Sequence, residues 1–115
     1  HAYNALGYTF ADRDIRLDEA QKLIEKALEL RPGDPQILDS MGWVLYRRGD
    51  LPGALAILRK AYALSPEVEI AAHLGEVLWK TGGLEEARRV WREARERDPS
   101  NQALQDTLAR LHVAL

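Results

Sequence analysis

Residues 38–66 have the sequence LDSMGWVLYRRGDLPGALAILRKAYALSP, in which a short glycine-containing turn separates two apolar helical segments. In the second segment, Ala54, Leu58 and Ala61 recur at intervals of four and three residues, which predicts one narrow face of a helix. Small residues on such a face let two antiparallel helices approach closely. Pro66 ends the segment, because proline cannot supply the amide hydrogen of a continuing helix. The stretch therefore predicts a pair of tightly packed helices.

The same frame occurs three times along the chain. The central copy has counterparts 34 residues earlier and 33 residues later. The three copies are Leu17, Ala20, Ile24, Ala27, Pro32; Leu51, Ala54, Leu58, Ala61, Pro66; and Leu84, Ala87, Trp91, Ala94, Pro99. A period of this length with small residues at helical spacing predicts helix-turn-helix repeats stacked into a solenoid.

The spacing of the glycine, the two alanines and the proline resembles that of the tetratricopeptide repeat family, over essentially the whole chain. The residues that carry this resemblance are Gly42, Ala54, Ala61 and Pro66, and then Gly75, Ala87, Ala94 and Pro99. The family implies an all-α, right-handed solenoid of antiparallel helix pairs in a single domain over residues 1–115. We expect three repeats and a C-terminal closing helix, at about residues 1–33, 34–67, 68–100 and 101–114.

The pattern predicts seven helices. Their expected ranges are 1–12, 18–30, 35–48, 52–64, 68–81, 85–97 and 101–114. Asp34 and Asn101 are expected to act as N-caps. Gly7 precedes Ala20 by 13 residues, whereas the later glycines precede their alanines by 12. We expect the polar stretch 12–14 to absorb this extra residue.

Composition agrees with a helical protein-binding domain. The chain is 46% hydrophobic and 30% charged, with a net charge of -2, which is too mixed in sign for a nucleic-acid surface. It has no cysteine, so disulfides and thiolate metal sites are excluded. No apolar run approaches the ~20 residues of a membrane span. His1 already lies in an apolar helical pattern without an initiator methionine, so we expect a fragment of a longer protein.

The side chains beside the core-facing stripe of each first helix should line a concave groove. In the second repeat, Leu38, Met41 and Leu45 face the core, and their neighbours face away from it. The residues predicted to line a partner-binding groove are Asn4, Tyr8, Asp39, Trp43, Tyr46, Arg47, His73, Glu76, Trp79, Lys80, Asp106 and Arg110.

The aromatic residues of this groove predict a non-catalytic adaptor or scaffold that binds a peptide segment or a protein surface. Aromatic rings give a large contact area at low entropy cost, and Arg47 and Lys80 can pair with carboxylates. The alternative is self-association, or a structural module within a larger repeat scaffold. Partial exposure of Trp43 and Trp79 would favour binding, whereas Trp91 belongs to the core in either case.

Some members of this family bind the C-terminal carboxylate of a partner with a clamp of lysine, arginine and asparagine in the groove. This chain keeps the asparagine as Asn4. At the other clamp positions it has Tyr8, Ser40, Glu69 and His73. The resemblance therefore implies an internal segment or a folded surface as the ligand rather than a C-terminus.

Catalysis has one weak candidate. His73 and Glu76 share a helix face at a spacing of three, which permits metal binding or acid–base chemistry. The sequence shows no third ligand, glycine-rich phosphate loop or nucleophile motif. We expect no catalytic residue, no metal and no cofactor.

Three strings resemble the C-terminal repeats of large proteobacterial envelope lipoproteins built from tetratricopeptide repeats. They are AYNALGY at 2–8, DSMGWVLYR at 39–47 and AAHLGEVLW at 71–79. This resemblance implies a periplasmic location through a missing N-terminal anchor, with the cytoplasm as the alternative. The implied partners are proteins, such as an envelope protease or a wall-modifying enzyme, with no nucleic acid and no membrane insertion by this chain.

Overall fold

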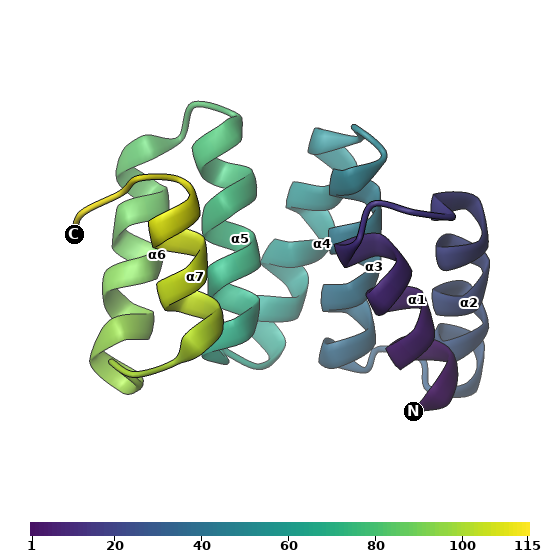
Figure 1. The fold of residues 1–115 in the computed structure, drawn as a ribbon. Coiled ribbons are helices and arrows are strands. Elements are labelled where there is room, and N and C mark those ends of the chain that lie inside the picture. Colours follow the sequence, from purple (N-terminus) through teal and green to yellow (C-terminus); the bar gives the residue numbers. More distant parts are fainter.

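The computed structural model describes all 115 residues, and every regular element in it is a helix (Figure 1). The elements are α1 (Ala2–Asp12), α2 (Leu17–Leu30), α3 (Pro35–Arg47), α4 (Leu51–Leu64), α5 (Val68–Lys80), α6 (Leu84–Arg97) and α7 (Gln102–Arg110). The expected boundaries of the first six helices are confirmed to within one residue. None of the helices combines the length and the apolarity that a crossing of the lipid bilayer needs.

The helices form an all-α solenoid of successive pairs. α1 packs on α2, α3 on α4, and α5 on α6. The first helices of the pairs also pack side by side, α1 on α3 and α3 on α5, and α7 continues this row by packing on α5 (Figure 1). The row α1–α3–α5–α7 therefore forms one side of the solenoid, which we call the concave side.

Each pair is held together at a glycine of its first helix. A Cβ atom on Gly7 would lie 2.7 Å from Ile24 Cγ1, and one on Gly42 would lie 2.5 Å from Leu58 Cγ. At Gly75, the added carbon would collide with the buried Trp91 indole. These separations are shorter than van der Waals contact, so only glycine lets the two helices approach this closely.

The turns and caps follow the sequence pattern. The Asp34 carboxylate accepts hydrogen bonds from the backbone N–H groups of Gln36 and Ile37, at 2.9 and 3.2 Å. The Asn101 side chain accepts one from the Leu104 N–H at 3.0 Å, so both predicted N-caps are confirmed. The loop 13–16 holds the extra residue of the first pair.

The last helix is shorter than the range 101–114 expected from its apolar spacing. α7 ends at Arg110, because His112 has a φ of 58° that no α-helix accommodates. The chain then turns back, and Leu111, Val113 and Leu115 pack against the core of α5 and α6. The Arg88 guanidinium fixes this tail by donating a hydrogen bond of 2.8 Å to the Ala114 carbonyl.

The glycine contacts generate a prediction about stability. Gly75→Ala forces a methyl group against the rigid Trp91 ring, and overpacking of this kind costs about 1–3 kcal/mol of unfolding free energy. Urea denaturation followed by circular dichroism measures the loss. Trp91→Leu removes the indole that the added methyl group would strike. The double variant should therefore lose less unfolding free energy than the sum of the losses in the two single variants. Strictly additive losses would contradict the steric explanation.

Candidate functional site

Two clusters of polar and aromatic side chains connect the helices of the concave side. The histidine cluster consists of Tyr8, Asp39, Trp43 and His73 and joins α1, α3 and α5. The glutamate cluster consists of Tyr46, Glu76 and Arg110 and joins α3, α5 and α7. Because their hydrogen-bonded pairs are 30 to 65 residues apart in sequence, both clusters depend on the stacking of the repeats.

His73 is the centre of the histidine cluster. Its Nδ1 lies 2.8 Å from Asp39 Oδ1, and because an ionised carboxylate can only accept, Nδ1 carries the hydrogen and donates it. Nε2 lies 3.1 Å from the Tyr8 hydroxyl, which donates to it when the imidazole is neutral. The result is a directional chain of hydrogen bonds from Tyr8 through His73 to Asp39.

The environment keeps the Tyr8 hydroxyl protonated. Burial raises the pKa of Tyr8 well above its ordinary value, and the nearby carboxylates of Asp12 and Asp39 raise it further. Tyr8 therefore remains a hydrogen-bond donor throughout the physiological pH range.

Trp43 is buried, with only 2% of its surface exposed, so it lacks the partial exposure that would favour a binding groove. The His73 ring stacks on its indole with centroids 4.2 Å apart, and the Arg47 guanidinium lies 4.9 Å from the centroid. Its Nε1–H donates a hydrogen bond of 3.2 Å to Asp12. The helical period identified the face that carries Trp43, but neighbouring helices cover that face.

Glu76 is the buried member of the glutamate cluster, with 2% exposure. It accepts two hydrogen bonds from Arg110, at 3.1 and 2.6 Å, and one of 2.9 Å from the Tyr46 hydroxyl. Burial by itself raises the pKa of Glu76, but the hydrogen bonds from Arg110 and Tyr46 outweigh it and hold the pKa below its ordinary value. Glu76 is therefore ionised and internally paired rather than available to a ligand.

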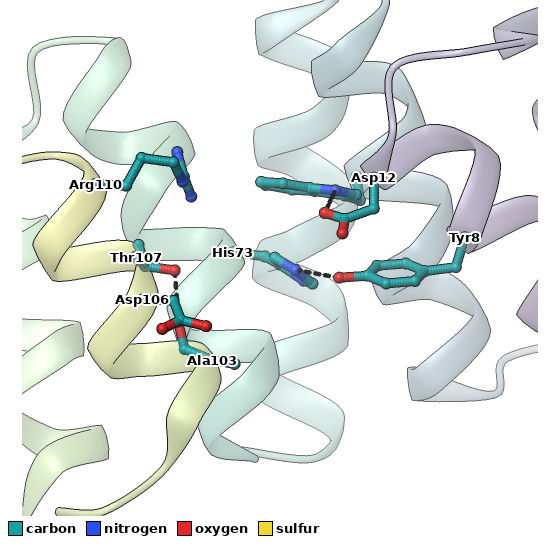
Figure 2. A pocket seen from close by; sticks show the side chains of 8 residues that line it. Tyr8, Asp12, His73, Ala103, Asp106, Thr107 and Arg110 are labelled. Atoms are coloured by element: carbon teal, nitrogen blue, oxygen red, sulfur yellow. Dashed lines mark hydrogen bonds between the residues drawn. The ribbon is translucent and has the colours of Figure 1, made fainter.

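Two cavities open beside these clusters. The Arg110 cavity, of about 300 Å³, lies between α1, α3, α5 and α7 (Figure 2). The Asn4 cavity, of about 270 Å³, lies between α1, α3 and α5. Tyr8 and His73 line both, so their hydrogen-bonded pair lies between the two cavities.

The Arg110 cavity has mixed charge. Figure 2 shows Arg110, Thr107 and Asp106 on the α7 side, across from Asp12 and Tyr8 on the α1 side. Its carboxylates already have internal donors: Asp106 accepts from the Gln102 amide at 2.6 Å, and Asp12 accepts from Trp43.

The Asn4 cavity is lined mainly by polar and acidic side chains and by no lysine or arginine. Its lining residues are Asn4, Ala5, Tyr8, Gln36, Asp39, Ser40, Glu69 and His73. The five positions assigned to a carboxylate clamp by family resemblance thus meet in one cavity. Two of its eight residues are acidic, opposite in charge to such a clamp.

Five of the residues predicted for the groove line neither cavity, namely Tyr46, Arg47, Glu76, Trp79 and Lys80. The Trp79 ring packs against Trp91, with centroids 5.7 Å apart, and the Arg88 guanidinium lies 5.4 Å from its centroid. Trp79 lies near the end of α5, from which its ring reaches α6 instead of the groove. Lys80 is exposed at the same helix end and lines no cavity.

The predicted groove omitted several lining residues that helical spacing could have identified. Asp12 follows Tyr8 by four residues, and Thr107 precedes Arg110 by three, so each shares a face with a predicted residue. Gln36 precedes Asp39 by three residues in α3, so the same spacing could have identified it. No group of three or more histidine, cysteine, aspartate or glutamate side chains is arranged to hold a metal ion.

Comparison with known families identifies the class of protein that this fold and concave face define. Two tetratricopeptide repeat models match the chain, over residues 2–69 and 45–111. The chain belongs to the tetratricopeptide repeat family.

Among curated proteins, a TPR repeat-containing protein of Pseudomonas aeruginosa is 59% identical over 75 residues, which cover 65% of this chain and 13% of that protein. The chain therefore matches only a small part of this relative's length. The first TPR domain of Spaghetti (RPAP3), solved with an HSP90 peptide, has a TM-score of 0.80 at 19% identity and covers 96% of this chain and 90% of that one. PcrH, solved with the chaperone-binding region of PopB, has a TM-score of 0.74 at 22% identity, with 95% and 88% covered.

The glutamate cluster generates a prediction about pH. Arg110→Ala leaves the Glu76 carboxylate buried without its charged partner, which should cost about 2–3 kcal/mol of unfolding free energy at pH 7. Because the folded-state pKa of Glu76 is depressed, the stability that it contributes is present above its unfolded pKa and is lost as the pH falls through the folded value. Without Arg110, burial raises the pKa of Glu76 with less to oppose it. The Glu76 carboxyl of the variant therefore takes up a proton at a higher pH than that of the parent.

The difference in stability between the parent and Arg110→Ala should therefore shrink as the pH falls from neutral toward the acid range. Denaturant unfolding at a series of pH values measures it. Arg95→Ala is the matched control, since Arg95 is an exposed helical arginine without a recorded ion pair, and it should change stability little at any pH. A difference for Arg110→Ala that does not vary with pH would contradict the ion-pair assignment.

Proposed function

We propose that the chain is a non-catalytic protein-binding module whose concave side holds a segment of a partner protein. The observation that carries this proposal is the pair of cavities on one face, with walls fixed by the histidine and glutamate clusters. A site whose side chains are already held in place loses little entropy on binding. The module thus acts by preorganisation rather than by chemistry.

The proposal of a non-catalytic role has support in how His73 and Glu76, the pair at a spacing of three in α5, are engaged. Both ring nitrogens of His73 have hydrogen-bond partners, and Glu76 is ionised and bound by Arg110 and Tyr46. Glu76 is therefore not free to exchange a proton with a substrate.

Two proteins of this fold were solved with a peptide or a segment of another protein, namely an HSP90 peptide and the chaperone-binding region of PopB. At such low identity the likeness concerns the fold, and the cavities of this chain supply the argument for binding. We propose an internal segment as the ligand, because acidic residues occupy the Asn4 cavity where a C-terminal carboxylate would be repelled.

The location and the partner are proposed from resemblance. The three strings that resemble envelope lipoprotein repeats, together with the Pseudomonas relative, favour a place on the periplasmic face of a bacterial membrane as part of a longer scaffold. An envelope protease or a wall-modifying enzyme is the proposed partner class.

Self-association is the second candidate, and one observation favours it. Tyr3 and Leu6 on α1 are 42% and 46% exposed, although they are large apolar side chains. A mass that rises with protein concentration in sedimentation would favour this candidate.

Photo-crosslinking tests which side binds. A photoreactive amino acid replaces Ala5, which is exposed and lines the Asn4 cavity, or Ala56, which is exposed on α4 and lines no cavity. In a bacterial envelope extract, we expect a partner protein to be captured from position 5 and not from position 56, because the concave side holds the ligand.

The helicity of both variants should match that of the parent, since each replaces an exposed alanine. Capture from position 56 alone would contradict the proposal and move the site to the other side of the solenoid. Crosslinks only between copies of the chain would favour self-association.

A further inference from the structure

We propose that the Asn4 cavity binds the charged end of a basic side chain, lysine or arginine, carried by an extended segment of the partner protein. This inference rests on the proposed function, because it specifies the ligand of the same concave side. The six side chains that would surround the cationic group are Asn4, Tyr8, Asp39, Ser40, Glu69 and His73.

The first argument is a buried acceptor without a donor. Asn4 Oδ1 is inaccessible to solvent and has no hydrogen-bond partner within the chain. Leaving such an atom unpaired costs about 1–3 kcal/mol, so native proteins usually satisfy it. Because Asn4 lines the cavity, a rotation of its side chain would expose this oxygen to a ligand that donates hydrogen bonds.

The second argument is the charge of the cavity. Asp39 is only 6% exposed, and the one hydrogen bond recorded for its carboxylate comes from His73. Glu69 stands at the exposed rim and accepts a hydrogen bond of 2.8 Å from the Asn101 amide. A carboxylate has about four acceptor positions, so both retain capacity for a further donor. No lysine or arginine lines the cavity: Asp39 is paired only with His73, and Glu69 has no cationic partner within the chain.

The third argument comes from the rest of the concave side, where the chain's own guanidinium groups take the equivalent role. Arg110 binds the buried Glu76, and Arg47 lies over the Trp43 ring and donates to the Asp12 carbonyl at 3.2 Å. On this face, therefore, one arginine pairs with a buried acidic group and another with an aromatic ring. The Asn4 cavity has the same kind of wall but lacks the cation.

The volume of the cavity suits a single side chain. Its volume of about 270 Å³ lies just below the roughly 300–1,000 Å³ of pockets for drug-sized ligands. Tyr8 donates its hydrogen to His73 and keeps oxygen lone pairs for a ligand, while its ring offers a surface for the alkyl stem of lysine or arginine.

Four short peptides test the inference directly. Each is N-acetylated and C-amidated with the sequence Gly-Ser-X-Ser-Gly, where X is lysine, arginine, norleucine or glutamate. Norleucine keeps the alkyl chain of lysine without the ammonium group. In nitrogen-15 NMR titrations at millimolar concentration, we expect the lysine and arginine peptides to shift the Asn4 side-chain amide and the Ser40 resonance. They should bind about tenfold more tightly than the norleucine peptide, as expected for charge-assisted hydrogen bonds.

Glu69→Gln keeps the size of the rim residue and can still accept from Asn101, but it removes one charge. It should weaken the binding of the lysine peptide about threefold to tenfold and leave the norleucine peptide unchanged. Glu85→Gln, at an exposed glutamate of α6 outside the cavity, is the control and should leave both unchanged.

Three results would overturn the inference. They are equal affinity for the lysine and norleucine peptides, no resonance shift with either basic peptide, and an affinity for the lysine peptide that Glu69→Gln does not change. A free N-terminal amine on the norleucine peptide should not restore binding; if it does, the ligand is a chain terminus and not a side chain. The photo-crosslinking experiment separates this inference from the proposed function. If position 5 captures the partner equally well in the Glu69→Gln variant, the proposed function stands and this inference is wrong.

Discussion

The close approach of two helices at a glycine is the constraint on which this structure depends. Gly7, Gly42 and Gly75 occupy the same place in the three pairs, and no side chain larger than hydrogen fits there without moving Ile24, Leu58 or Trp91. One face of each first helix packs against the second helix of the same pair. Another face packs against the first helix of the neighbouring pair. The row α1–α3–α5–α7, and every contact on the concave side, follows from this division of faces.

The concave side is filled largely by the chain itself. A histidine cluster joins α1 to α5 across α3, and a glutamate cluster joins α3 and α5 to α7. Both contain an acidic residue that would be costly to bury alone, Asp39 and Glu76, and both resolve the cost with partners from another repeat. The two clusters therefore couple the stacking of repeats to the shape of the binding face. What they leave open is two small cavities, beside Arg110 and beside Asn4, rather than a long aromatic groove.

Sequence analysis predicted the fold because a repeat depends on local spacing and on a few small residues, which are visible in one dimension. The caps at Asp34 and Asn101 were predictable for the same reason. The helical period also placed Trp43 and His73 on the correct face. It could not show that His73 stacks on Trp43 and that Arg47 covers it, because these contacts depend on the distance between neighbouring repeats. The end of α7 was not predicted because the residue with left-handed backbone, His112, is not a glycine, the residue type that usually indicates such a turn.

The protonation of His73 tests most directly whether the histidine cluster organises this face as described. Long-range proton–nitrogen NMR of the imidazole at pH 8 distinguishes the two neutral tautomers, with the exposed His1 and His112 as internal references. The account predicts a hydrogen on Nδ1, slow to exchange with water because it is donated to Asp39, and an unprotonated Nε2 that accepts from Tyr8. A hydrogen on Nε2 alone, or rapid exchange like that of the reference histidines, would contradict the directional chain and with it the preorganised cavity.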